Sequence, residues 1–191
     1  MLALLTVTPA MAEERERGFV DLYGGGLRLV ESDVPDWQFR DTVGTAGARV
    51  GVWFAEPWGL AFRTWYFQSD AREEPSGLPS DLAFLGMSLE LLARWRLGDR
   101  WTFYGSLGPA LAVTTLDRAQ LVDGAVRDED DRSLAPGATG SLGIEARLVG
   151  PLRAFVEGQA SVVYPEFEFS DRTLTPVLVN LYGLAGVRLA F

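Results

Sequence analysis

Alternation of apolar and polar residues with a period of two limits the fold of this chain more than any other feature. Between residues 82 and 97 the odd-numbered positions are apolar, whereas most even-numbered positions from Gly86 to Arg96 are small or polar. Successive side chains of a β-strand point to opposite faces, so this pattern predicts strands with one apolar face. From Gly18 onward no segment has a convincing helical period.

Eight such stretches occur, separated by connections of two lengths. We expect strands at 19–30, 42–54, 59–69, 82–97, 101–113, 138–148, 152–164 and 177–191. Tight turns at 55–58, 98–100 and 149–151 alternate with longer polar loops at 31–41, 70–81, 114–137 and 165–175. The sequence therefore predicts an all-β fold, an eight-stranded antiparallel up-and-down transmembrane β-barrel with short periplasmic turns and longer extracellular loops.

The N-terminus has the features of an export signal. An apolar run from Leu2 ends in Ala10-Met11-Ala12, a small-x-small cleavage pattern, and is too short to span a bilayer. We assign residues 1–12 to a signal peptide remnant and residues 13–191 to the outer-membrane barrel domain. The chain has no cysteine, so disulfides and thiolate metal sites are excluded.

Aromatic residues gather at the expected strand ends. Trp58, Trp101 and Phe191 lie near the turns, and Trp37, Tyr66, Phe67, Tyr164 and Phe167 lie near the loops. Two such girdles are typical of a barrel that spans a membrane. The alternative is a soluble lipocalin-like binding barrel, whose apolar face points inward. The polar face of this chain is rich in small residues that suit a narrow interior, which favours the membrane barrel.

The last strand ends in Val187-Arg188-Leu189-Ala190-Phe191, with apolar residues at alternate positions before a terminal phenylalanine. In this it resembles the small outer-membrane barrel proteins of the OmpA/OmpX and OmpW type. The resemblance implies a location in the bacterial outer membrane. It also implies that Phe191 is an assembly signal read by the barrel-assembly machinery during biogenesis.

Acidic and basic residues share the faces that we expect to point inward. These are Arg49, Arg63, Glu90, Arg94, Arg96, Glu145, Arg147, Arg153, Glu157 and Arg188. Charges in a narrow interior are costly unless they are paired, and the mixed signs allow a cross-strand network. We expect a polar plug that closes the barrel, with a polar pore lining as the alternative. Eight strands leave room for little more than side chains, which favours the plug.

Acidic residues are concentrated in the four expected loops, which hold 17 of the 26 acids against six arginines. This charge argues against a nucleic-acid partner. The densest group is Asp128, Glu129, Asp130 and Asp131, a weak candidate for binding Ca²⁺ or Mg²⁺. Its spacing fits no EF-hand, so we expect a solvated loop and no metal or other cofactor.

Catalysis is the weakest interpretation. The chain contains no histidine and no lysine, so the usual bases that activate a serine are missing. Glu145 and Glu157 could act as an acid and base pair, but arginines nearby in sequence favour salt bridges. We therefore expect no enzyme and no catalytic residues.

Two kinds of function remain. The first is a structural or surface-interaction role for a barrel closed by its interior network. The second is a narrow pore or carrier for small or hydrophobic solutes, for which Leu92, Val163, Leu178 and Leu184 add apolar surface to the inward face. In either case we expect a monomer whose partners are outer-membrane lipid and lipopolysaccharide.

Overall fold

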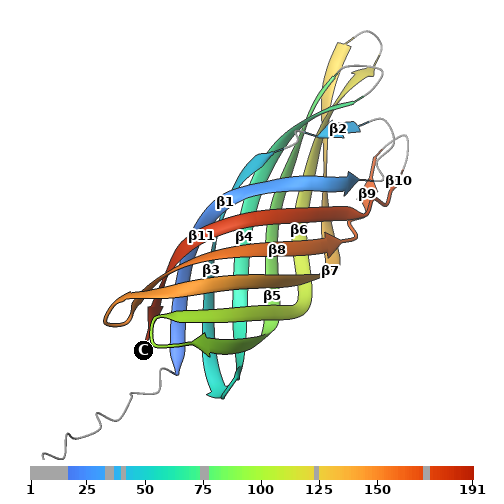
Figure 1. Ribbon diagram of the computed structural model, residues 1–191. Coiled ribbons are helices and arrows are strands. Elements are labelled where there is room, and N and C mark those ends of the chain that lie inside the picture. Colours follow the sequence, from blue (N-terminus) through green and yellow to red (C-terminus); the bar gives the residue numbers. More distant parts are fainter. Residues whose placement is uncertain (1–16, 33–36, 40–41, 74–77, 123–124, 170–172) are drawn as a thin grey trace, which may run out of the picture.

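The computed structural model describes residues 17–32, 37–39, 42–73, 78–122, 125–169 and 173–191. Eight long strands form the wall of a cylinder (Figure 1). They are β1 (Gly18–Ser32), β3 (Val43–Ala55), β4 (Trp58–Glu73), β5 (Pro79–Leu97), β6 (Trp101–Val122), β7 (Ala125–Val149), β8 (Leu152–Val163) and β11 (Leu178–Ala190). The short strands β2 (Trp37–Phe39), β9 (Phe167–Glu168) and β10 (Thr173–Leu174) lie at the loop end.

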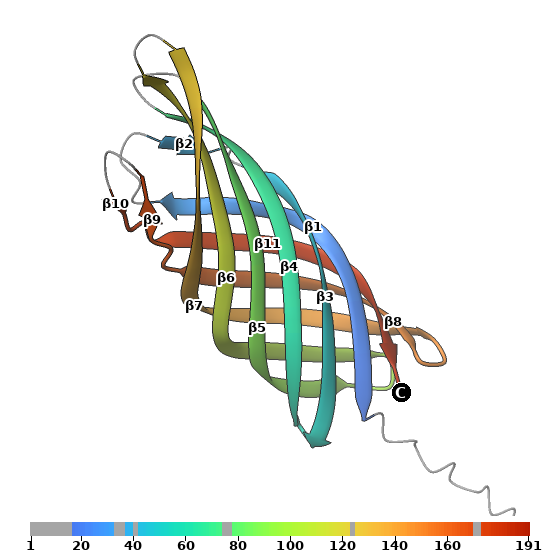
Figure 2. The same ribbon diagram turned by 180° about the vertical axis from the view of Figure 1, so that it is seen from behind.

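The wall closes on itself. The long strands pair antiparallel in the order β4-β3-β1-β11-β8-β7-β6-β5, and β4 also pairs with β5. The first and last strands meet along a seam from Phe19↔Ala190 to Ser32↔Leu178. Figures 1 and 2 show the closed cylinder from its two sides. The predicted eight-stranded antiparallel barrel is confirmed.

The described residues include no helix with the length and apolar character needed to cross a bilayer.

The alternation in sequence corresponds to side chains that point alternately into the barrel and out of it. Burial alternates residue by residue along β5 and β11, and the predicted apolar faces of both strands point outward. Polar residues at the intervening positions point into the barrel, where they are buried. The two-residue period therefore assigned each side chain in these strands to the correct face.

The prediction of an irregular loop at 114–137 is wrong for the described residues of that range. Residues 114–137 are not irregular, because β6 continues to Val122 and β7 begins at Ala125, with paired residues as far as Val122↔Ala125. In Figure 1 this hairpin projects beyond the rest of the wall. A hairpin outside the membrane has no apolar side to present, so a strand there lacks the alternation that marks the spanning strands. The predicted loops 31–41 and 165–175 likewise contain the short strands β2, β9 and β10.

Large aromatic rings inside the barrel lie over glycines on neighbouring strands. Trp65 is paired with Gly86, and a Cβ at Gly86 would lie 2.3 Å from the Trp65 ring. Tyr104 is paired with Gly143, where the corresponding distance is 2.5 Å. The inward face is rich in small residues, as expected, but it also carries large aromatic rings. Glycine on one strand makes room for an aromatic side chain from the next.

The predicted aromatic girdles are partly correct. Trp58, Trp101 and Phe191 are exposed near the turns, and Tyr66 and Tyr164 are exposed near the loops. Phe67 and Phe167 were wrongly placed in the outer girdle, because both are buried inside the barrel. An aromatic residue near a strand end has no sequence signal for its face when neighbouring residues on both faces are apolar or aromatic. The side chain of Trp37 lies outside the described residues.

Candidate functional site

A continuous chain of ion pairs fills the half of the barrel nearer the short turns. Its eight side chains come from seven of the eight long strands. Basic and acidic groups alternate in the order Arg153, Glu145, Arg188, Asp21, Arg49, Glu157, Arg63 and Glu90. None of these side chains is more than 10% exposed. Four positive and four negative groups alternate, so each buried charge has an opposite neighbour.

Asp21 joins strands β1, β3 and β11 in the middle of this chain. Its Oδ1 accepts a hydrogen bond from Arg188 Nε at 2.7 Å, and its Oδ2 accepts one from Arg188 Nη2 at 2.8 Å. Arg49 Nε donates to the same Oδ2 at 2.7 Å. The two parallel bonds from Arg188 have the bidentate geometry that makes arginine–carboxylate pairs strong. On its other side Arg188 donates to Glu145, which also accepts from Arg153 Nη1 at 2.7 Å.

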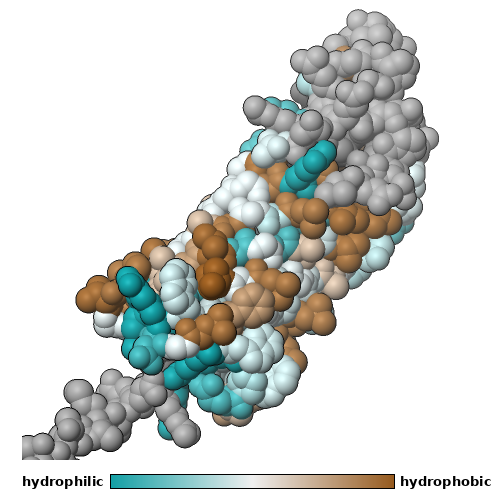
Figure 3. Space-filling model, in the orientation of Figure 1, coloured by the Kyte–Doolittle hydropathy of each residue, from teal (hydrophilic) through white to brown (hydrophobic). Residues whose placement is uncertain are grey.

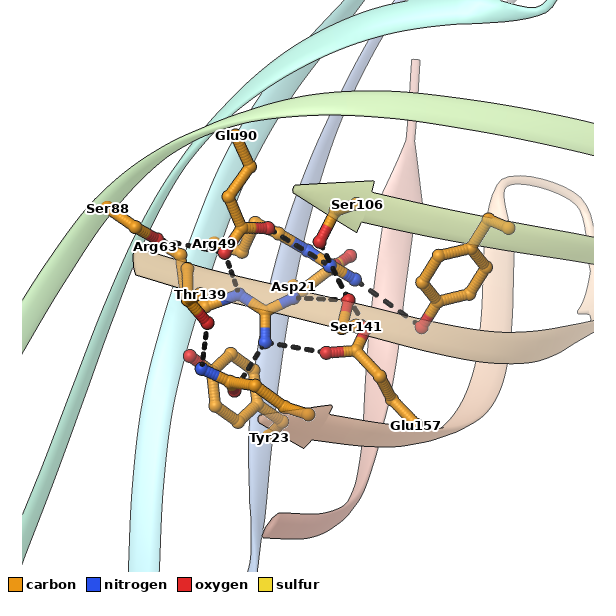
Figure 4. Close-up of polar contacts among 12 residues, drawn as sticks. Asp21, Tyr23, Arg49, Arg63, Ser88, Glu90, Ser106, Thr139, Ser141 and Glu157 are labelled. Atoms are coloured by element: carbon orange, nitrogen blue, oxygen red, sulfur yellow. Dashed lines mark hydrogen bonds and ion pairs between the residues drawn. The ribbon is translucent and has the colours of Figure 1, made fainter. Parts of the chain in front are cut away.

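Glu157 carries the chain across the barrel. Its carboxylate lies 3.0 Å from Arg49 Nη1 and 2.6 Å from Arg63 Nη1, so it bridges β8 to β3 and β4. Arg63 Nε lies 2.9 Å from Glu90 on β5, which also accepts a hydrogen bond from Ser88 at 2.8 Å. Figure 4 shows Arg63 between these two carboxylates. Each of the eight charged side chains in the ion-pair chain therefore has at least one oppositely charged neighbour.

Aromatic rings cover the arginines of this chain. The Arg188 guanidinium carbon lies 4.2 Å from the centroid of the Phe19 ring and 4.9 Å from that of Tyr104. Arg49 lies 5.2 Å from the Tyr104 ring and 5.8 Å from that of Phe155. A guanidinium over an aromatic face within about 6 Å is attracted to it, more strongly where water is excluded. Ion pairs and stacked rings are therefore packed together in this half of the barrel.

The structure places most predicted interior residues as expected. Eight of the ten are buried, and seven of these belong to the ion-pair chain. Arg94 is buried apart from the chain and binds Glu56 at 2.7 Å, near the turn-end mouth. Arg96 and Arg147 are exposed, which corrects their assignment to the buried network. Both share the inward parity of their strands, but lie so near the strand ends that their side chains reach the rim.

Asp21 was missed, although the sequence contained a signal for it. Phe19, Asp21 and Tyr23 alternate with Val20 and Leu22, and the acid lies on the same face as two aromatic residues. Both faces of the first strand carry apolar or aromatic residues, so the sequence pattern does not show which face points inward. The closed barrel resolves them, because Asp21 is paired with Arg188 and Arg49 on its two neighbours.

The interior changes character towards the loop end. Buried apolar side chains there form one cluster that includes Leu27, Val43, Trp65, Phe67, Leu82, Phe84, Leu116, Val163, Leu178 and Leu184. Phe67 and Phe84 stack with their ring centroids 4.6 Å apart. Tyr182 lies in the same cluster and accepts a hydrogen bond from Trp65 Nε1 at 3.0 Å. Leu92, predicted to extend this apolar surface, belongs instead to a small separate cluster with Phe19 and Ala61.

A hollow of about 620 Å³ opens in the wall beside this apolar cluster. The ladder between β3 and β4 ends at Thr45↔Phe67, and β2 pairs with β4 further along, at Ala71, Arg72 and Glu73. The lining contains Val43 and Phe67, which are buried in the cluster, and also Tyr66 and Gln68, which are exposed on the outside. The hollow is therefore bordered by both faces of the barrel wall.

The acidic run 128–131 is part of β7 and not the solvated loop that we expected. A strand sends successive side chains to opposite faces, so Asp130 and Asp131 point to different sides of the sheet. Asp131 accepts a hydrogen bond from the backbone N–H of Glu168 at 2.6 Å. The side chains of Asp128 and Glu129 lie outside the described residues. Within the described part of the chain, no group of three or more acidic side chains could hold a metal ion.

Four aspartates instead form a row across the outer face near the loops. Asp70 is paired with Asp81, Asp81 with Asp117, and Asp117 with Asp130. All four side chains are exposed. Like charges directly opposite one another destabilise a sheet, and water and salt reduce that cost.

The outer face of the wall is apolar between the two ends. Each long strand exposes at least one large apolar side chain there, namely Leu22, Val50, Phe62, Leu89, Leu107, Leu142, Val156 and Leu181. Figure 3 shows apolar side chains spread over the outer surface of the cylinder. A belt of this extent around a closed barrel is suited to lipid and not to water.

Solved structures with the same fold are outer-membrane proteins. The outer membrane protein OprG of Pseudomonas aeruginosa matches with a TM-score of 0.61 and 15% identity, over 92% of this chain and 97% of that chain. A major outer membrane protein of Thermus thermophilus matches with a TM-score of 0.60 and 11% identity, over 91% of this chain and 99% of that one. The chain has the fold of an outer-membrane β-barrel. The outer-membrane protein AlkL, determined in lipid bilayers, matches this barrel with a TM-score of 0.53 and 9% identity, over 92% and 90% of the two chains.

No protein-family model matches the sequence of this outer-membrane barrel, and the comparison with curated proteins finds no match. The likeness to solved structures therefore establishes the fold. It overturns the soluble lipocalin-like alternative, as does the apolar outer belt. The three solved relatives are described as outer-membrane proteins, and none is described as an enzyme.

Proposed function

We propose that this outer-membrane barrel takes up small apolar molecules from the cell-surface side and releases them through its wall into the membrane. The observation that carries the proposal is the division of the interior into an apolar cluster at the loop end and a polar plug at the turn end. An apolar molecule gains by leaving water for the first compartment and loses by entering the second.

The plug favours a sideways exit over an axial one. The network around Asp21, Arg49 and Glu157 would have to lose several buried ion pairs before a solute could reach the periplasm. Breaking one partner of such a pair leaves an uncompensated buried charge, which is strongly unfavourable. The hollow between β3 and β4 adjoins the apolar cluster and needs no such rearrangement.

The test is to fill the hollow without disturbing the barrel. Gly44 lines it, and a Cβ at Gly44 would meet no atom within 4 Å, so Gly44→Trp places an indole in open space. We expect G44W to slow uptake of the apolar dye N-phenyl-1-naphthylamine several-fold in cells that express the barrel. Gly158→Trp is the matched control, because Gly158 is equally open but lies away from this hollow. Equal uptake by the two variants would refute the lateral route.

A structural or surface-interaction role is the second candidate, favoured by the hairpin of β6 and β7. The backbone of this hairpin is paired as far as Val122↔Ala125, and the hairpin projects beyond the wall (Figure 2). An epitope tag inserted at residues 123–124 should be recognised by antibody on intact cells. If hairpin removal abolishes a surface phenotype while dye uptake is unchanged, this second role is favoured over the first.

The barrel-assembly machinery, outer-membrane lipid and lipopolysaccharide remain proposed partners. In support of Phe191 as an assembly signal, its backbone exchanges hydrogen bonds with Gly18 of 2.7 and 2.9 Å, and its ring lies against Gly18 at the seam. The outward apolar belt supports lipid and lipopolysaccharide as the surrounding partners. The monomeric state stays a prediction. The division at residue 12 also stays a prediction, since residues 1–16 lie outside the described part.

A further inference from the structure

The strand β9 and the residue that follows it fold into the loop-end mouth of the barrel. Phe167 and Phe169 are 2% and 8% exposed, and both belong to the apolar interior cluster. Their rings are stacked with centroids 6.5 Å apart. Two phenyl groups from a connecting segment therefore lie where the barrel interior meets the outside.

Side chains, and not a ladder, attach this segment to the wall. β9 and β10 form a separate two-stranded sheet. The N–H of Glu168 donates to Asp131 Oδ2 at 2.6 Å, and the N–H of Glu166 donates to Ser133 Oγ at 2.8 Å. Both acceptors belong to β7, whose neighbour Arg118 on β6 lies with its guanidinium carbon 5.4 Å from the Phe169 ring. A segment held by few bonds opens more readily than a strand of the wall.

We infer that the segment 166–169 is a lid and that its phenyl rings occupy the binding place of a ring-sized apolar molecule. The inference rests on the proposed uptake function and adds to it a ligand class and a gate. Lifting the lid removes two phenyl groups from the cluster and exposes apolar surface of matching size. An aromatic or similarly compact hydrocarbon can replace them, because most side chains of the cluster are apolar and gain by contact with an apolar ligand.

Two engineered forms set the lid open or shut. Asp131→Ala with Ser133→Ala removes both side-chain acceptors, and we expect at least about a tenfold larger open population. Ser133→Cys with Glu166→Cys allows a thiol cross-linker that contains a reducible disulfide to tie the lid to β7. The natural chain has no cysteine, so the cross-link is unambiguous and its reduced form is the matched control.

The readout is photolabelling of the folded barrel in lipid bilayers with a phenyl diazirine, an apolar probe of phenyl size. Trypsin cleaves after Arg72 and Arg94, and residues 73–94 contain no other arginine or lysine, so one peptide carries most of β5. Its buried residues Leu82 and Phe84 report entry into the interior, and its exposed residues Leu85 and Leu89 report lipid. The ratio of inner to outer labelling is thus corrected for probe concentration within one molecule.

We expect this ratio to rise several-fold when the two acceptors are removed and to fall when the cross-link forms. Equal ratios in the open, cross-linked and reduced forms would overturn the lid while leaving uptake intact. Phe167→Ala with Phe169→Ala separates failure of the lid from failure of the proposed uptake function, because it removes both rings from the interior directly. If even that variant shows no inner labelling, the interior does not admit apolar molecules and the proposed function itself fails. Heat modifiability on gels verifies that every form is folded.

Discussion

At the scale of single residues, Asp21 shows how little freedom the interior leaves. Its carboxylate receives three hydrogen bonds from Arg49 and Arg188, and its side chain is fully buried. The loss of this acid would weaken two arginines at once. Arg49 would keep Glu157 and Arg188 would keep Glu145, but Arg188 would lose two hydrogen bonds and Arg49 one.

We predict that Asp21→Asn destabilises the barrel by about 3–5 kcal/mol, because it leaves a buried positive charge uncompensated. Urea unfolding in lipid vesicles, followed by tryptophan fluorescence, measures the change. The outward neighbour Leu22 supplies a control, since Leu22→Ala faces lipid and leaves the network whole. Unchanged stability in D21N would show that the network contributes little.

The same chemical change at Asp81 should have the opposite sign. Asp81 is exposed between Asp70 and Asp117 in the row of aspartates. Asp81→Asn removes two unfavourable cross-strand neighbours, and we predict a gain of about 0.2–1 kcal/mol. Because the repulsion is between exposed charges, the gain should shrink in high salt. A loss of stability, or a gain independent of salt, would contradict this origin.

At the scale of elements, adjacent strands are matched by the volume of their inward residues. Trp65 on β4 occupies the space above Gly86 on β5, and its indole donates to Tyr182 on β11. One glycine therefore permits contacts among three strands. This matching acts between residues far apart in sequence, so no local pattern announces it.

We predict that Gly86→Ala costs about 1–3 kcal/mol, because the new methyl group overlaps the Trp65 ring. The cost should be much smaller in a Trp65→Leu background, which removes the ring. Gly158→Ala is the matched control, as a Cβ there meets no atom within 4 Å. Additive effects of the G86A and W65L changes in vesicle unfolding would argue against the volume match.

The hairpin of β6 and β7 is an element that the alternation could not reveal. Within the wall, one face of each strand meets lipid and the other meets the interior, so apolar and polar residues alternate. Beyond Arg118, where the pairing with β5 ends, β6 continues to pair with β7 from Ala119↔Asp128 to Val122↔Ala125. Backbone pairing extends these strands, and their sequence looks like a loop.

At the scale of the whole molecule, the interior holds ion pairs towards the turns and a large apolar cluster that extends towards the loops. Ion pairs tie seven of the long strands together. The proposed plug would block a water-filled path along the axis. This agrees with the narrow interior that eight strands leave.

We predict that the wild-type barrel shows no single-channel conductance in planar bilayers. Removing the pair that spans the interior, Arg49→Ala with Glu157→Ala, should produce conductance steps, because the pair is lost without leaving net charge. Leu22→Ala in the lipid-facing belt serves as the control and should stay silent. Ion conduction by the wild-type barrel would contradict a closed plug and restore the pore interpretation.

The sequence by itself determined the class of fold, the eight spanning strands and which face of β5 and β11 meets lipid. Each of these follows from a period of two and from turn lengths, which are local properties of the chain. Only the tertiary structure decided that Asp21 joins Arg49 and Arg188, that Phe67 and Phe167 lie inside, and that Asp131 holds β9. Those outcomes depend on strand register and closure, which bring together side chains that are far apart in sequence.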